Sequence, residues 1–191
     1  MLPDNLRNIA RQAILQRKTV NLAIFGPGRQ SPFFEKREAV LSAVRDEHPG
    51  AIINFYMIDD LVSPSESYED YLKRVRPVEI EQIEWADVIL FLLTHHRLTA
   101  LVEYILVRDL DPNLDEKPYD KCGLALSKDL EVSPLWVYEA KRTLQAKGLG
   151  GADRIIEFSA DDLNTCHVAK DVAVELFQRV AIDRWSLQLH K

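Results

Sequence analysis

The chain has 191 residues, of which 47% are hydrophobic, and a formal net charge of −6. This length and composition are enough for one hydrophobic core without a second domain. The negative charge, with no basic run to offset it, argues against general binding to nucleic-acid backbones. The two cysteines, Cys122 and Cys166, have no CxxC spacing and no neighbouring histidine cluster, so the sequence predicts no disulfide, no metal site and no cofactor.

The sequence also lacks the features of a secreted or membrane protein. Its first residues have no apolar signal-peptide core, and no run reaches the roughly 18 apolar residues of a membrane span. We therefore expect a cytoplasmic protein without membrane contact.

The first predicted element is an amphipathic helix over residues 4–17, where Leu6, Ile9 and Ile14 recur at helical spacing. We expect this N-terminal segment, residues 1–18, to dock on the body of the protein. A basic targeting helix is the alternative, but Asp4 in the first turn is typical of an ordinary helix start.

Beyond this helix, the hydrophobic pattern predicts strands that alternate with helices. The predicted strands are residues 20–25, 51–56, 87–93, 123–127 and 154–158, and the predicted helices are residues 32–47, 78–85, 98–109, 134–147 and a C-terminal helix within 160–187. Residues 59–70 form a polar segment between the second strand and its helix. This order predicts an α/β fold: one Rossmann-like domain over residues 1–191, with a parallel five-stranded sheet and helices on both faces.

Three polar segments are expected to meet at the carboxyl edge of this sheet, where open α/β folds bind ligands. The first is the loop from Gly26 to Ser31, which offers backbone N–H groups, the Arg29 guanidinium and the Ser31 hydroxyl to a phosphate. Gly26 and Gly28 fit neither a GxGxxG fingerprint nor a P-loop, so a tight turn without a ligand is the alternative.

The second segment is acidic and the third leads to Glu103. Asp59, Asp60 and Glu79 form the acidic set. Glu103 follows a buried strand and a polar loop, which makes it the first candidate for chemistry. The alternative is a carboxylate that only stabilises a helix N-terminus, by about 0.3–1 kcal/mol.

Three further residues flank the strand that precedes Glu103. His95 and His96 precede Glu103 and are either ligands of a ribose or an exposed loop pair. Asp87 starts the strand at its opposite end, and we expect a structural role for it.

These motifs resemble the nucleoside 2-deoxyribosyltransferases and the related deoxynucleoside-monophosphate N-glycosidases. The resemblance rests on Phe25-Gly26-Pro27-Gly28-Arg29, on Glu79 eight positions before Asp87, and on Glu103 sixteen positions after it. It is closer to the deoxyribosyltransferase-like effectors encoded beside retron reverse transcriptases, and it extends over roughly residues 20–180.

The resemblance implies that Glu103 is the nucleophile at the anomeric carbon and that Glu79 contacts the base. It implies that the loop from Gly26 to Arg29 shapes the sugar and phosphate site. It also implies a homo-oligomer in phage defence, held inactive by a reverse transcriptase with its RNA–DNA product. The apolar residues of the C-terminal helix suggest such an interface independently, through Val172, Val174, Leu176, Phe177 and Val180.

The chain departs from the family around Glu103, where glycines are usual. Here Thr99, Leu101 and Val102 precede the glutamate, and bulky residues near a sugar narrow a pocket. The loop also resembles the segment before the catalytic glutamate of TIR-type NAD hydrolases. We therefore expect a nucleotide N-glycosidase that hydrolyses NAD or a related nucleotide, and the alternative is a catalytically compromised nucleotide-binding or scaffold module.

Overall fold

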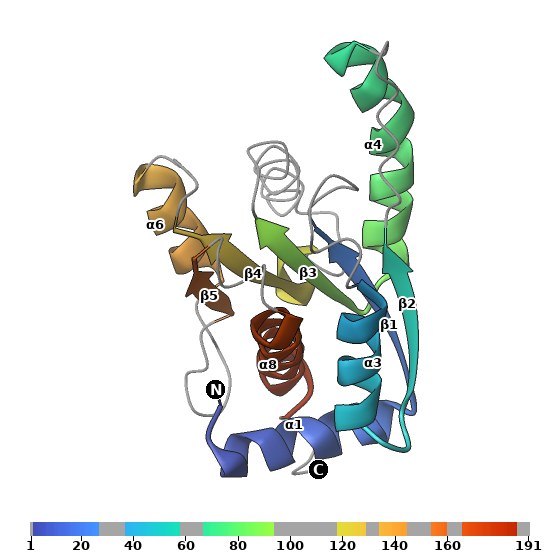
Figure 1. The fold of residues 1–191 in the computed structure, drawn as a ribbon, viewed down its shortest axis with the longest axis vertical. Coiled ribbons are helices and arrows are strands. Elements are labelled where there is room, and N and C mark those ends of the chain that lie inside the picture. Colours follow the sequence, from blue (N-terminus) through green and yellow to red (C-terminus); the bar gives the residue numbers. More distant parts are fainter. Residues whose placement is uncertain are drawn as a thin grey trace.

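A computed structural model describes residues 2–26, 37–57, 67–93, 118–128, 134–144, 154–159 and 166–186. It confirms the expected α/β fold, with a five-stranded, all-parallel sheet in the order β2-β1-β3-β4-β5 (Figure 1). The strands are β1 (Thr19–Phe25), β2 (Ile52–Met57), β3 (Val88–Leu93), β4 (Cys122–Ser127) and β5 (Ile155–Phe158). The helices are α1 (Asp4–Arg17), α3 (Arg37–Glu47), α4 (Tyr68–Trp85), α6 (Pro134–Thr143), α8 (Cys166–Trp185) and the short 3₁₀ helix η1 (Pro118–Lys121).

The central strands are apolar on both faces because helices cover both. Leu22 and Ile24 of β1 pack in one cluster with residues of α1, α3 and α8, whereas Ala23 and Phe25 pack in a second cluster with residues of α4 and α6. Side chains alternate across a strand, so a continuous apolar run is the pattern of a strand buried on both sides. The described part of the chain therefore has three layers, helix, sheet and helix.

Helix α8 lies along the middle of one face, beside α3, and α1 crosses below it (Figure 1). The apolar residues of α8 pack in the hydrophobic core of this chain. Val172, Leu176, Phe177 and Val180 are buried there, and Val174 packs against the same cluster. The expected apolar surplus for an oligomer interface on this helix is therefore wrong, because α3, α1 and the sheet cover these side chains.

Helix α4 is longer than the sequence analysis predicted. It begins at Tyr68 rather than near residue 78, and the Ser67 side chain caps it by accepting a hydrogen bond from the Asp70 backbone N–H at 3.2 Å. Pro77 lies inside the helix, where it removes one backbone hydrogen bond. The helix continues because Val75 and Ile83, on either side of the proline, share a buried stripe.

Asp87 has the structural role expected for it. Its Oδ2 accepts a hydrogen bond from the Asn21 backbone N–H at 2.9 Å, and its own N–H donates to the Asn21 carbonyl at 2.8 Å. Arg184 of α8 donates to the Asp87 carbonyl. These bonds tie β1, β3 and α8 together at the amino edge of the sheet, away from the expected site.

Candidate functional site at the carboxyl edge

The strand order defines where a ligand cleft belongs. From β1 the chain passes to β2 on one side and later to β3 on the other, so the order reverses between β1 and β3. In open parallel sheets, ligands bind outside the carboxyl ends of the strands at this reversal, because the two following loops diverge there. Phe25 and Phe91 are paired in register beside the reversal and stack with ring centroids 5.1 Å apart.

Gly26 directly follows β1 at this position and is half-buried. Most of the other candidates lie outside the described residues; they are Gly28, Arg29, Ser31, Asp59, Asp60, His95, His96 and Glu103. Along the chain, they belong to the segments that follow β1, β2 and β3, three strands that are neighbours in the sheet.

Glu79 is described, and the fold brings it to the same edge. It lies seven residues before Ala86, where α4 ends, so it stands about 10 Å along the helix from that end. In β1, Leu22 pairs with Val88, the first residue of β3. From Leu22 to Phe25, the last residue of β1, the strand rises by about 10 Å, the same distance. Because α4 runs roughly antiparallel to the strands and lies beside β1 (Figure 1), these two distances put Glu79 near the carboxyl edge of the sheet, where Gly26 follows β1.

The Glu79 side chain occupies a position where a helix normally places an apolar residue. The residue is 8% exposed and continues the buried stripe of Val75 and Ile83. Burial raises the pKa of the carboxyl group, and the Arg76 guanidinium, with Nη1 3.1 Å from Glu79 Oε2, lowers it in part. A carboxyl group whose pKa is raised by burial is typical of a general acid.

A purely structural ion pair between Arg76 and Glu79 is the alternative explanation. Against it, Oε2 of Glu79 is shielded from solvent and accepts no hydrogen bond within the described part of the chain. Buried polar atoms in structural roles are nearly always hydrogen-bonded. The unsatisfied oxygen therefore makes Glu79 a candidate for a role beyond the ion pair.

Sequence reasoning missed Arg76 as a site residue. The signal was present, since an arginine three positions before a glutamate on a helix lies on the same face. It became visible only once α4 was known to begin before residue 76.

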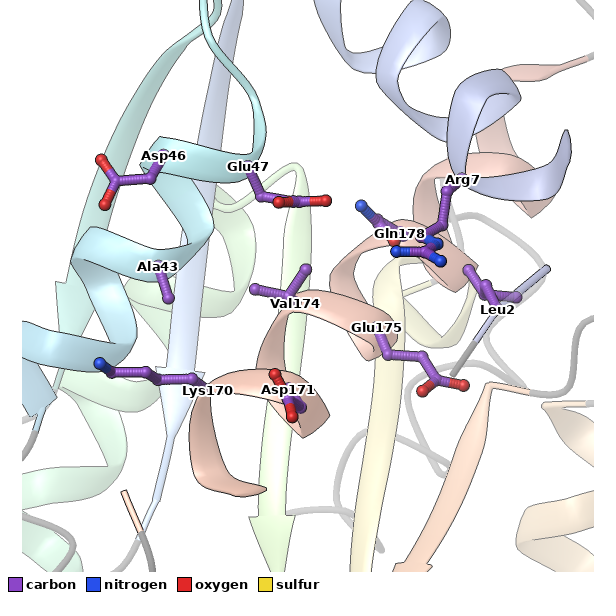
Figure 2. Close-up of a pocket in the computed structure, with 10 residues that line it drawn as sticks. All are labelled: Leu2, Arg7, Ala43, Asp46, Glu47, Lys170, Asp171, Val174, Glu175 and Gln178. Carbon is purple, nitrogen blue, oxygen red and sulfur yellow. The ribbon is translucent and has the colours of Figure 1, made fainter. Parts of the chain in front are cut away.

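A cavity of about 300 Å³ lies elsewhere, among α1, α3 and α8 (Figure 2). Its lining comprises Leu2, Arg7, Ala43, Asp46, Glu47, Lys170, Asp171, Val174, Glu175 and Gln178. Glu47 pairs with Arg11, and Glu175 pairs with Arg179 at 2.6 Å. Arg7 pairs with Asp4 in the same way, so three of the charged side chains that line the cavity are engaged within the chain.

Two searches of the described residues were negative. No cluster of three or more His, Cys, Asp or Glu side chains with the geometry to hold a metal ion occurs among them. Of the helices in the described ranges, none combines the length and apolar character needed to cross a bilayer.

Comparison with protein-family models, curated proteins and solved structures finds no match to this chain. The function proposed below therefore rests on the described geometry and on the motifs of the sequence.

Proposed function

We propose that the protein is a nucleotide N-glycosidase that hydrolyses NAD or a related nucleotide, with water as the final acceptor. The observation that carries the proposal is the buried Glu79 carboxyl group on α4, near the carboxyl edge of the sheet where the strand order reverses. In the sequence, Glu103 follows ten residues after Leu93, the last residue of β3, the other strand at this reversal. Most enzymes that cleave glycosidic bonds use two carboxyl groups.

In the proposed reaction, the bond between C1′ of the sugar and a ring nitrogen of the base breaks. The Glu103 carboxylate stabilises the positive charge that develops at C1′, or captures it as an ester. Water then attacks C1′, loses a proton and restores the free carboxylate.

The two substrate classes differ in the leaving group. A purine needs a proton as it leaves, and Glu79, whose pKa is raised by burial, is suited to supply it. Nicotinamide leaves NAD as a neutral molecule from a cationic ring, and it requires little acid assistance.

The substrate class is tested by incubating the purified protein with NAD, purine and pyrimidine nucleosides, and their monophosphates. Chromatography would follow the free base in each reaction. Release of one base, with matching loss of its nucleotide, supports the proposal. Absence of free base from every substrate, in a folded protein that still binds one of them, favours the nucleotide-binding module instead.

The resemblance to retron effectors extends this proposal to phage defence by a cytoplasmic homo-oligomer. In that setting a reverse transcriptase with its RNA–DNA product would hold the enzyme inactive. Light scattering of the protein alone tests the oligomer. Base release measured with and without the reconstituted reverse transcriptase complex tests the inhibition.

A further inference from the structure

Glu79 and Arg76 form a charged pair on the inner side of α4. Their side chains are 10% and 23% exposed, and Val75 and Ile83 flank Glu79 in the buried stripe. By contrast, Lys73, one turn earlier, is 67% exposed and pairs with Glu69 and Asp70 in solvent. Arg76 and Glu79 therefore interact in a much less polar environment than the charges around Lys73, and charges act more strongly on one another in such an environment.

The contact between Arg76 and Glu79 is an ion pair rather than a hydrogen bond. Nη1 of Arg76 is 3.1 Å from Oε2 of Glu79, and Oε2 accepts no hydrogen bond from the described residues. Oε2 is shielded from solvent, so the guanidinium supplies its charge directly to a buried carboxyl oxygen.

Burial and the neighbouring charge act on Glu79 in opposite directions. Burial raises the pKa of its carboxyl group, and Arg76 is the described charged group that lowers it. A general acid must lose its proton to the substrate and regain one before the next turnover, and it works best when neither form is strongly favoured. Burial alone would favour the protonated form throughout.

We propose that Arg76 is a positioning residue for Glu79: it holds the carboxyl group against α4 through the ion pair, and it lets Glu79 give up and regain a proton in each turnover. This inference rests on the proposed N-glycosidase function. The proton that passes from Glu79 to the base nitrogen is replaced by the proton that the attacking water loses at C1′, so the cycle is balanced without another reactant.

The first test is a titration of the ligand-free protein, which requires no activity. Carbon-13 NMR of labelled glutamate carboxyl groups follows Glu79, and the signal missing from Glu79→Gln assigns it. Arg76→Gln and Arg76→Met each remove the charge, and the methionine keeps an aliphatic stem. We expect both to move the Glu79 midpoint to higher pH, and Arg76→Lys to keep it near that of the wild type. Lys73→Gln, which removes a solvent-exposed charge from the same helix, is the matched control and leaves the midpoint unchanged.

The second test is the pH profile of base release from a purine nucleotide. Its alkaline limb reports loss of the proton from the general acid. We expect this limb to move to higher pH in Arg76→Gln and Arg76→Met in parallel with the NMR midpoint, and to be restored by Arg76→Lys.

The outcomes separate the two proposals. An unchanged Glu79 midpoint in either folded variant lacking the charge overturns the role of Arg76, whatever the enzyme does. A midpoint that moves while the alkaline limb stays fixed also overturns it. If no substrate releases a base, the N-glycosidase proposal fails, and the titration still decides whether Arg76 controls the proton on Glu79.

Discussion

Gly123→Ala tests how closely α8 packs on the sheet. The candidate site lies at the carboxyl edge of this sheet. A Cβ atom at residue 123 would lie 2.7 Å from Cγ and 2.9 Å from Cδ1 of Leu176, and 3.0 Å from Cγ2 of Val180. Carbon atoms at optimal separation are about 3.5–4.0 Å apart. Leu176 and Val180 are fully buried, so neither can turn toward solvent to make room.

Overpacking of this kind costs about 1–3 kcal/mol, and replacing a strand glycine by alanine returns about 0.5–1 kcal/mol. We therefore expect Gly123→Ala to lower the free energy of unfolding by about 1–2 kcal/mol, and the Tm by about 2–8 °C. Urea denaturation followed by circular dichroism measures the first value, and calorimetry measures the second.

A double-mutant cycle identifies the cause. Leu176→Ala alone should cost about 2–5 kcal/mol by opening a cavity. In that background Gly123→Ala should cost less, because the two closest atoms, Cγ and Cδ1 of Leu176, are gone and only Cγ2 of Val180 remains. If Gly123→Ala is as stable as the wild type, or if its cost is the same in both backgrounds, the close packing of α8 against β4 is not as described.

Two further predictions concern titratable residues. Glu79→Gln should reduce kcat on purine nucleotides by about 10²–10⁴-fold, the usual span for general acid catalysis. On NAD it should mainly raise KM, because nicotinamide needs little acid assistance. Steady-state kinetics on both substrates test this, and an equal loss of kcat on NAD would contradict it. His48 is buried, with Nδ1 2.6 Å from the Val44 carbonyl oxygen and Nε2 3.2 Å from Gln178 Nε2. Burial is the largest influence on the pKa of His48 and lowers it; the hydrogen bond to Val44 and the nearby Glu47 raise this pKa, and Arg11 lowers it. Because the unfolded chain then binds the extra proton more readily, the free energy of unfolding should fall as pH drops below about 6.5, the ordinary histidine pKa. Urea midpoints between pH 5 and pH 8 should show this slope in the wild type and a weaker one in His48→Gln; identical slopes would exclude His48 as its source.

The sheet could be predicted from the sequence because its signal is local and strong. The apolar runs at β1 and β3, each followed by polar residues, are typical of strands buried on both faces, and their alternation with helices fixes parallel pairing. The position of Gly26 at the end of β1 follows from the same pattern.

The candidate site could be predicted only in part, because tertiary burial decides the remainder. A glutamate on a predicted helix is usually exposed, and nothing local indicates that Glu79 faces the core beside Arg76. The start of α4 was missed because its first turns are polar and Pro77 interrupts the pattern, while Ser67 supplies the cap that begins it. The C-terminal helix was misjudged for the opposite reason: its many apolar residues face α1, α3 and the sheet, which the sequence alone does not bring together.

The central claim is that a carboxylate at Glu103 breaks an N-glycosidic bond. The direct measurement is the rate of free-base release from NAD and from a purine nucleotide by the wild type and by Glu103→Gln, at equal concentrations and with matched circular dichroism spectra. The change is nearly isosteric and removes the charge and the nucleophile, so we predict that base release is lost on every substrate that the wild type cleaves. A folded Glu103→Gln protein with wild-type turnover would contradict the account.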